Sequence, residues 1–121
     1  MTTDSTWSVY PCWLLVHPDD VSRLDDETIE VVAGARFVMG RNYRSRQYLP
    51  VFTGRERAIA FVESTPQVGV PAIVSARDPA DFLEWLDGCR GIAEEVTINP
   101  TGGDDRVASS IPFDDFYNRI K

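Results

Sequence analysis

The sequence predicts a single α+β or α/β domain over residues 1–121, with a mixed sheet of about five strands packed by three to four helices. Two observations carry this prediction. The first half of the chain has short runs rich in β-branched and aromatic residues, whereas the second half alternates such runs with amphipathic segments of about ten residues. The chain also has no internal repeat and no dividing linker, and its length suits one buried core.

The amino-terminal part of the chain begins with a predicted strand. Residues 1–8 are polar, and we expect them to be frayed, whereas residues 9–16 are rich in Val, Tyr, Trp and Leu. The strand stops before Pro18, since proline ends ladder pairing. Residues 19–34 give two signals, because their apolar side chains have helical spacing while residues 29–31 alternate as in a strand. For this segment we favour a helix.

A hairpin follows. Two strand-like runs, residues 36–39 and 48–52, are separated by the polar residues 40–47, which predicts a hairpin with a long, arginine-rich loop. Pro50 has no N–H to give to a ladder, so we expect it at a sheet edge or at the start of a strand.

Two helix starts have clear signals. Thr53 is followed three residues later by Glu56, a spacing in which each side chain can satisfy a free amide of the other, and this helix is expected to run to residue 64. Asp78 and Pro79 open a second helix as its N-cap and first helical residue. The second helix carries an apolar stripe formed by Phe82, Trp85, Leu86 and Cys89.

The remaining elements complete the alternation. We expect a buried strand at residues 70–76 and another at residues 96–98, closed by a turn over residues 99–103. Ser110 and Pro112 are expected to open the last helix, which we expect to be integral to the core because of the apolar area it would bury. Its apolar stripe is formed by Phe113, Phe116, Tyr117 and Ile120.

Composition excludes several classes of protein. No apolar run, that of residues 13–16 included, is longer than five residues, which is far short of the roughly 20 residues of a membrane-spanning helix, and the amino terminus lacks the features of a secretory signal. We therefore expect a cytoplasmic protein with no membrane partner. Cys12 and Cys89 are far apart and have no Cys or His companion, which predicts buried thiols and no disulfide, metal or cofactor.

Side chains that could carry catalysis are few. His17 is the only histidine, with Asp19 and Asp20 close behind it, and no GxSxG nucleophile elbow occurs in the sequence. The glycines at residues 102–103 are followed by two aspartates that would repel a phosphate group. The acidic pairs, Glu94-Glu95 among them, fit a solvated surface. The sequence therefore favours a protein that is not an enzyme.

The charge is unevenly distributed. The net charge of −7 divides into −6 over residues 1–30, +5 over residues 35–57 and −6 over residues 58–121. The acidic flanks argue against nucleic acid, whose binding depends on neutralising phosphates. A local basic segment suits an acidic protein partner or ion pairs within the fold. The residues that we predict to bind a partner are Arg36, Arg41, Tyr43, Arg44, Arg46 and Tyr48.

Residues 49–58 have the sequence Leu-Pro-Val-Phe-Thr-Gly-Arg-Glu-Arg-Ala, and a later strand closes with Ile-Asn-Pro at residues 98–100. Over about residues 35–100 this pattern resembles the bacterial SseB-type domain, the amino-terminal domain of the enhanced serine sensitivity protein. The resemblance implies a small α/β domain of largely unassigned biochemistry, often encoded near secretion or toxin-related systems. It implies no catalytic residues, so it bears on the fold more than on the chemistry.

Together these features favour a non-enzymatic protein-interaction or adaptor domain, with an immunity-type protein that neutralises a toxin as one variant. The alternative is a small-molecule or anion-binding domain with a pocket near His17 and the arginines. A homo-oligomer that associates through Trp7, Trp13 or an edge strand is a third hypothesis.

Overall fold

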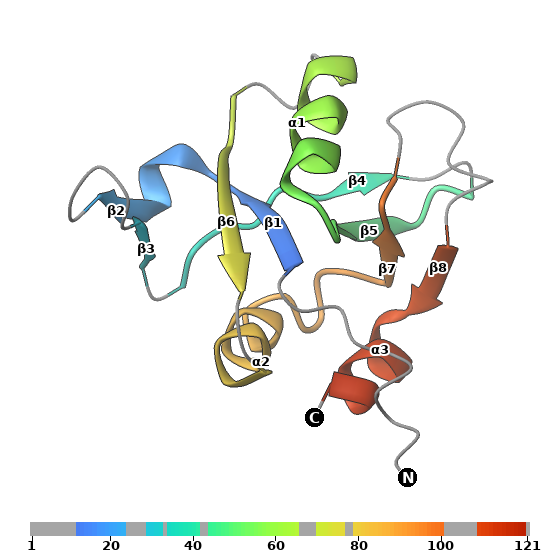
Figure 1. Ribbon diagram of the computed structural model, residues 1–121. Coiled ribbons are helices and arrows are strands. Elements are labelled where there is room, and N and C mark those ends of the chain that lie inside the picture. The colour runs from blue at the N-terminus through green and yellow to red at the C-terminus, as the bar shows by residue number, and fades with distance from the viewer. Residues whose placement is uncertain are drawn as a thin grey trace, which may run out of the picture.

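The computed structural model describes residues 12–23, 29–32, 34–41, 44–65, 70–76, 79–100 and 109–120. Over these residues the domain has the α+β architecture that the sequence predicts (Figure 1). Among these residues no helix is long and apolar enough to cross a membrane. The elements in chain order are β1 (Cys12–Val16), the 3-10 helix η2 (Pro18–Asp20), β2 (Val21–Arg23), β3 (Ile29–Val31), β4 (Gly40–Arg41), β5 (Gln47–Val51), α1 (Arg55–Ser64), β6 (Ala72–Ala76), α2 (Pro79–Asp87), β7 (Glu95–Ile98), β8 (Ser109–Pro112) and α3 (Phe113–Ile120).

The strands form three hydrogen-bonded groups, β4-β5-β7-β8, β1-β6 and β2-β3. β5 and β7 are parallel and the other pairs are antiparallel, so the largest group is mixed, as predicted. Trp13 and Phe52 exchange backbone hydrogen bonds of 2.8 and 2.9 Å, which joins β1 to the end of β5. Strands β6, β1, β5, β7 and β8 therefore follow one another across the molecule (Figure 1).

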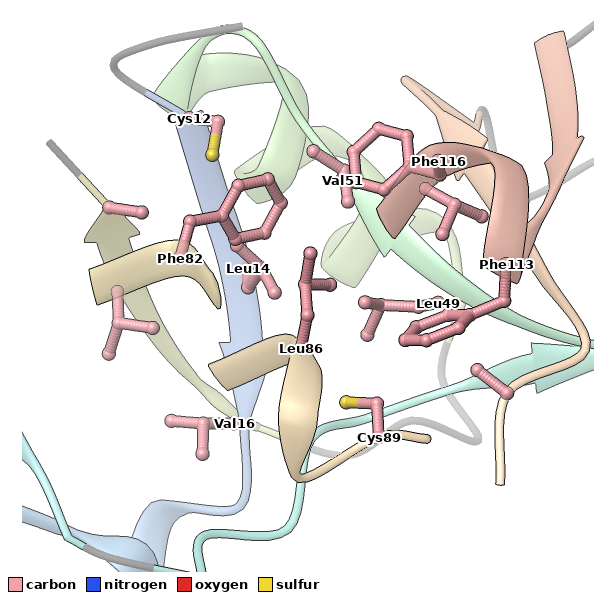
Figure 2. Packing of buried hydrophobic residues seen from close by; sticks show 14 residues of the cluster. Cys12, Leu14, Val16, Leu49, Val51, Phe82, Leu86, Cys89, Phe113 and Phe116 are labelled. Atoms are coloured by element: carbon pink, nitrogen blue, oxygen red, sulfur yellow. The ribbon is translucent and has the colours of Figure 1, made fainter. Parts of the chain in front are cut away.

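Helices pack on both faces of this arrangement. Leu14 of β1 lies in one buried cluster with Phe82 of α2 and Phe116 of α3, whereas its neighbour Leu15 lies in a second cluster with Phe61 of α1. Successive residues of a strand point to opposite faces, which accounts for the two cores. Figure 2 shows the aromatic side chains of α2 and α3 directed toward β1 and β5. Burying a phenylalanine contributes about 2–3 kcal/mol, so α3 is integral to the core, as predicted.

The described residues between 19 and 34 do not form the helix that we favoured, and residues 24–28 and 33 of that segment lie outside the described residues. A single 3-10 turn, η2, follows His17, and β2 and β3 then pair antiparallel with Val21 opposite Val31. Both valines are partly buried against the main core. β-branched side chains pack well on a pleated surface and lose rotamer freedom in a helix, so the alternating signal of residues 29–31 was the correct one.

The predicted hairpin forms, but its strands have other bounds than the predicted 36–39 and 48–52. β4 is only Gly40–Arg41 and pairs with Tyr48 and Gln47, while the preceding segment bonds to β1 through the Val38 N–H and the Leu15 carbonyl. Residues 36–38 of the predicted strand therefore pair with β1. Pairing with β5 begins only at Gly40.

Pro50 lies within β5, between β4 and β7, and not at an edge or a strand start. The carbonyls of Gln47 and Val51 accept hydrogen bonds from the β7 side, and the Phe52 N–H donates to β1. The backbone groups of successive strand residues point to opposite sides, so the nitrogen of Pro50 points away from β7 and toward the β4 side. On that side the pairing with β4 ends at Tyr48, two residues before Pro50. The missing N–H therefore removes no ladder bond.

The first predicted helix start is right in position and wrong in its cap. α1 begins at Arg55, and its N-cap residue is Gly54, with no side-chain cap hydrogen bond. The side chain of Thr53 bonds Asn99, 46 positions along the chain, and so does not cap the helix. Glu56 does fold back, but over Gly54, where an added Cβ would lie 2.6 Å from its Oε1.

The start of the second helix is predicted correctly, whereas the last helix begins later in the chain than predicted. α2 begins at Pro79, as predicted, and Asp78 lies outside the described residues. α3 begins at Phe113, because Ser110 and Pro112 belong to β8 and pair with β7. The Ser110 hydroxyl is 2.7 Å from that of Thr97 on β7, so it is used across the sheet and not as a cap.

Candidate functional site

The best-defined polar site lies where the β4-β5 loop meets β7. Glu95, the first residue of β7, has a buried side chain that is only 10% exposed. Arg44 donates from Nη2 to Oε1 at 3.2 Å and to Oε2 at 3.1 Å. A carboxylate away from water needs such a partner, since burial without one is very costly. The acidic pair Glu94-Glu95 is therefore not simply a solvated surface, as we expected, because Glu95 is part of the sheet interior.

Arg46 lies beside the same two acids. Its Nη1 is 3.9 Å from Oε1 of Glu94, and its Nε is 3.8 Å from Oε2 of Glu95. Glu94 also accepts the backbone N–H of Gln47 at 2.9 Å and donates its own N–H to the Gln47 carbonyl at 2.8 Å. The carboxyl-terminal side of the loop is thus fixed to β7 by both backbone and side-chain contacts.

Arg41 holds the loop from within. Its Nη1 donates to the carbonyl of Ser45 at 2.8 Å. Ser45 has a φ of 62°, a backbone conformation that residues other than glycine seldom adopt. Arg41 itself is exposed. Tyr43, which we predicted to bind a partner, lies outside the described residues.

Tyr48 does not belong to an exposed binding surface, contrary to our prediction. It is 3% exposed, and an added Cβ on Gly40 would lie 2.7 Å from its ring atom Cζ. The ring therefore fills the space that the absent side chain of Gly40 leaves on β4. The alternation of Tyr with Arg in the sequence could not show this, because the contact depends on the register between β4 and β5.

Arg36 forms a second site, with the η2 turn. It donates to Asp20 from its backbone nitrogen at 2.7 Å, from Nε at 2.9 Å and from Nη2 at 3.2 Å. These hydrogen bonds lower the pKa of Asp20 to about 2 and raise the pKa of Arg36. Arg36 Nη2 also lies 3.3 Å from Nδ1 of His17, whose side chain is 43% exposed, and Asp19 is 3.8 Å from the same ring atom.

The predicted arginine surface is therefore two separate sites. Figure 1 shows the ends of β4 and β5 that the loop joins on the opposite side of the molecule from η2. Arg41, Arg44 and Arg46 belong to the loop, which we call the arginine loop, and Arg36 belongs to the His17 site. Of the predicted arginines, the structure thus places Arg36 beside His17, where the carboxylates of Asp19 and Asp20 also lie.

The described residues of the two sites include no cysteine and no cluster of metal-ligating side chains. Over the described segments, no three His, Cys, Asp or Glu side chains are grouped to hold a metal ion. Cys12 and Cys89 are free and buried, as predicted, and burial raises the pKa of each thiol to about 12. Thiols with such values are inert as nucleophiles at neutral pH. What both sites offer is a set of hydrogen-bond donors held in place by carboxylates.

A comparison of the chain with models of known protein families gives no match, and a comparison with curated proteins gives none either.

Proposed function

We propose that this domain is a non-enzymatic protein-interaction module of the SseB-like type, which binds an acidic protein surface through Arg41, Arg44 and Arg46 of the arginine loop. One observation supports the proposal above the others. Arg44 and Arg46 are positioned by Glu95, the first residue of β7, and by Glu94 directly before it, while the arginine side chains stay 50% and 55% exposed. The arginines are thus ordered before a partner arrives, and their surface is still accessible.

Prior ordering matters because an interface must offset the entropy of fixing long side chains, at about 0.5–1.5 kcal/mol each. A guanidinium is planar and has five N–H donors, so it can face a carboxylate on one side and a partner on the other. Three arginines and two glutamates leave the loop site with a formal charge of +1. Recognition by this site therefore relies on directed hydrogen bonds more than on long-range attraction.

The test compares two pairs of substitutions with the same change in charge. Arg41→Ala with Arg46→Ala removes two loop arginines but leaves Arg44 on the buried Glu95. Arg55→Ala with Arg57→Ala removes two exposed arginines of α1. The tagged proteins are cross-linked in cells, and captured proteins are identified and quantified. We expect the α1 variant to retain the partner of the unchanged protein and the loop variant to lose at least nine-tenths of it, which corresponds to a loss of affinity of about tenfold or more.

Equal recovery by both variants, with equal thermal midpoints, would remove the arginine loop from the proposal. An immunity-type function is a variant of the same proposal, and it predicts that co-expression with a toxin encoded beside the gene restores growth. That rescue is expected to fail with the loop variant and to persist with the α1 variant.

The His17 site gives weaker support to the alternative of an anion-binding domain. Arg36 and His17 lie 3.3 Å apart, but Arg36 already makes three hydrogen bonds to Asp20. Asp19 and Asp20 would repel an anion that approached both groups. We therefore assign the interaction to the arginine loop.

A further inference from the structure

Among the described residues, the outer edge of β6 has no partner strand. β6 pairs with β1 over its whole length, from Cys12 opposite Ala76 to Val16 opposite Ala72. The other edge of β1 is occupied by Phe52 and by residues 36–38. An unpaired edge presents a row of backbone donors and acceptors that can pair with another strand.

The hydrogen bonds of β1 show which residues of β6 face outward. Trp13 exchanges backbone bonds with Phe52, and the Leu15 carbonyl accepts the Val38 N–H at 2.8 Å. These two residues of β1 therefore face away from β6. Because antiparallel pairs alternate, the even-numbered residues of β1 make the hydrogen bonds to β6.

The register then fixes the outward positions. Leu14 lies opposite Val74, so Val74 directs its backbone groups toward β1. Ile73 and Ser75, on either side of it, direct their N–H and carbonyl groups away from β1. Both side chains are partly exposed, and Val70, two residues before the strand, is 85% exposed.

This edge lacks the features that prevent strands from associating. Natural edge strands are usually protected by charged side chains, by proline or by a bulge. The five residues of β6, Ala-Ile-Val-Ser-Ala, include no charge and no proline, and their one-to-one register with β1 contains no bulge. Pro71 stands directly before the strand, beyond the outward backbone groups of Ile73 and Ser75. β6 is thus suited to accept a further strand.

We propose that this strand is β6 of a second copy, paired antiparallel about a two-fold axis that passes beside Val74. In this register Ile73 of each copy lies opposite Ser75 of the other. Each such pair exchanges two hydrogen bonds, so the two symmetry-related pairs give four. The sheets of the two copies become continuous, with both α1 helices on one face and both α2 helices on the other.

A second copy fits this edge better than a charged peptide does. The outward residues are complementary to themselves under two-fold symmetry, which is the usual symmetry of dimers. β6 has no charged side chain that could pair with an acidic or basic peptide. In a dimer, for the same reason, no like charges of the two strands lie opposite each other. The net charge of −7 on each copy opposes the dimer only at longer range, where salt screens it.

The first test is the sedimentation of the unchanged protein over a range of concentrations up to about 1 mM, the scale on which weak association becomes measurable. We expect a monomer–dimer equilibrium that becomes tighter as NaCl rises, because salt screens the repulsion between two acidic copies. A protein that stays monomeric at the highest concentration at every salt concentration would overturn the proposal.

The second test substitutes an outward residue. Ser75→Pro removes an N–H that faces away from β1, so the β1-β6 ladder keeps its hydrogen bonds. Ser75→Thr is the matched control, because it keeps the N–H. We expect the proline variant to raise the Kd at least tenfold and the threonine variant to change it less than twofold, since the symmetric dimer loses two hydrogen bonds at once. Equal Kd values for the two variants would contradict the pairing.

A third measurement needs no variant and covers the case in which Ser75→Pro fails to fold. Amide hydrogen exchange of Ile73 and Ser75 is expected to slow as protein concentration rises, whereas that of Val74 is slow throughout. Exchange independent of concentration at all three amides would refute the dimer. This outcome says nothing against the arginine loop, which joins β4 and β5 and contributes no residue to the β6 edge, so the two proposals can fail separately.

Discussion

Thr53 and Asn99 exchange two hydrogen bonds across the ends of β5 and β7. The Thr53 N–H donates to Asn99 Oδ1 at 2.9 Å, and Asn99 Nδ2 donates to Thr53 Oγ1 at 3.0 Å. The Asn99 N–H also donates to the carbonyl of Val51 at 2.8 Å. Asn99 has a φ of 52°, in the left-handed region that asparagine tolerates better than most residues. The two short sequence patterns at 49–58 and 98–100 are therefore parts of one contact.

This contact leads to the first prediction. Asn99→Ala removes three side-chain roles at once, namely a donor, an acceptor and tolerance of positive φ, and we expect it to lower the free energy of unfolding by about 2 kcal/mol. Asn99→Gly keeps the backbone conformation and loses only the side-chain bonds, so its cost is expected to be smaller, about 1 kcal/mol. Urea unfolding monitored by tryptophan fluorescence measures both. Equal costs would show that the backbone conformation contributes nothing.

The second prediction concerns Arg44 and Glu95. Arg44→Ala leaves a buried carboxylate without its main partner, which costs 3–5 kcal/mol in fully buried pairs. Because half of Arg44 is exposed, we expect about 2 kcal/mol here. Glu95→Gln in the Arg44→Ala background is expected to recover part of the loss, since a neutral amide is cheaper to bury.

The control for this pair is Arg41→Ala, because Arg41 bonds only a backbone carbonyl of its own loop among the contacts described, and we expect a cost below about 1 kcal/mol. If Arg44→Ala were no more destabilising than Arg41→Ala, Glu95 would not depend on Arg44.

The sequence predicted the elements whose signals are local. The apolar stripes of α2 and α3, the position of α1 and the strand at residues 96–98 depend on neighbours a few positions away. Thr53 and Glu95 were misassigned because their partners, Asn99 and Arg44, lie 46 and 51 positions away. The arginine loop was found through its charge, but which arginines pair with which acids depends on the register of β4, β5 and β7.

The third prediction concerns acid stability. Hydrogen bonds from Arg36 lower the pKa of Asp20 from 3.8 to about 2 in the folded protein. A lowered folded pKa gives stability that is fully present above the unfolded value and is lost as pH falls through the folded value. We therefore expect the difference in thermal midpoint between the unchanged protein and Asp20→Asn to be constant above about pH 5, to shrink as the pH falls toward 2 and to vanish only below about pH 2.

The comparison with Asp20→Asn cancels the titration of the other carboxylates, which both proteins share. A midpoint difference that keeps its full size as the pH falls from 5 to 2 would mean that Asp20 acts through its shape and not its charge.

The last prediction concerns the contact between α2 and α3. The Tyr117 hydroxyl donates to Asp87 Oδ1 at 2.7 Å, and the Arg90 guanidinium lies 4.9 Å from the centre of the same ring. The hydrogen bond to Asp87 raises the pKa of Tyr117. A raised folded pKa gives stability that is present below the unfolded value, 10.0, and is lost as pH rises through the folded value.

Tyr117→Phe keeps the ring under Arg90 and removes only the hydroxyl, so it isolates the hydrogen bond to Asp87. We expect the variant to have a lower thermal midpoint than the unchanged protein at pH 7 and the two midpoints to converge above pH 10, because ionised Tyr117 would face the Asp87 carboxylate. Asp87→Asn is expected to bring the pKa of Tyr117, followed by ultraviolet absorbance, closer to 10.0. An unchanged titration in that variant would show that the hydroxyl does not depend on Asp87, and that α3 is held on α2 by other contacts, among them the edge-on pair of Phe82 and Phe116 and the position of Arg90 over the Tyr117 ring.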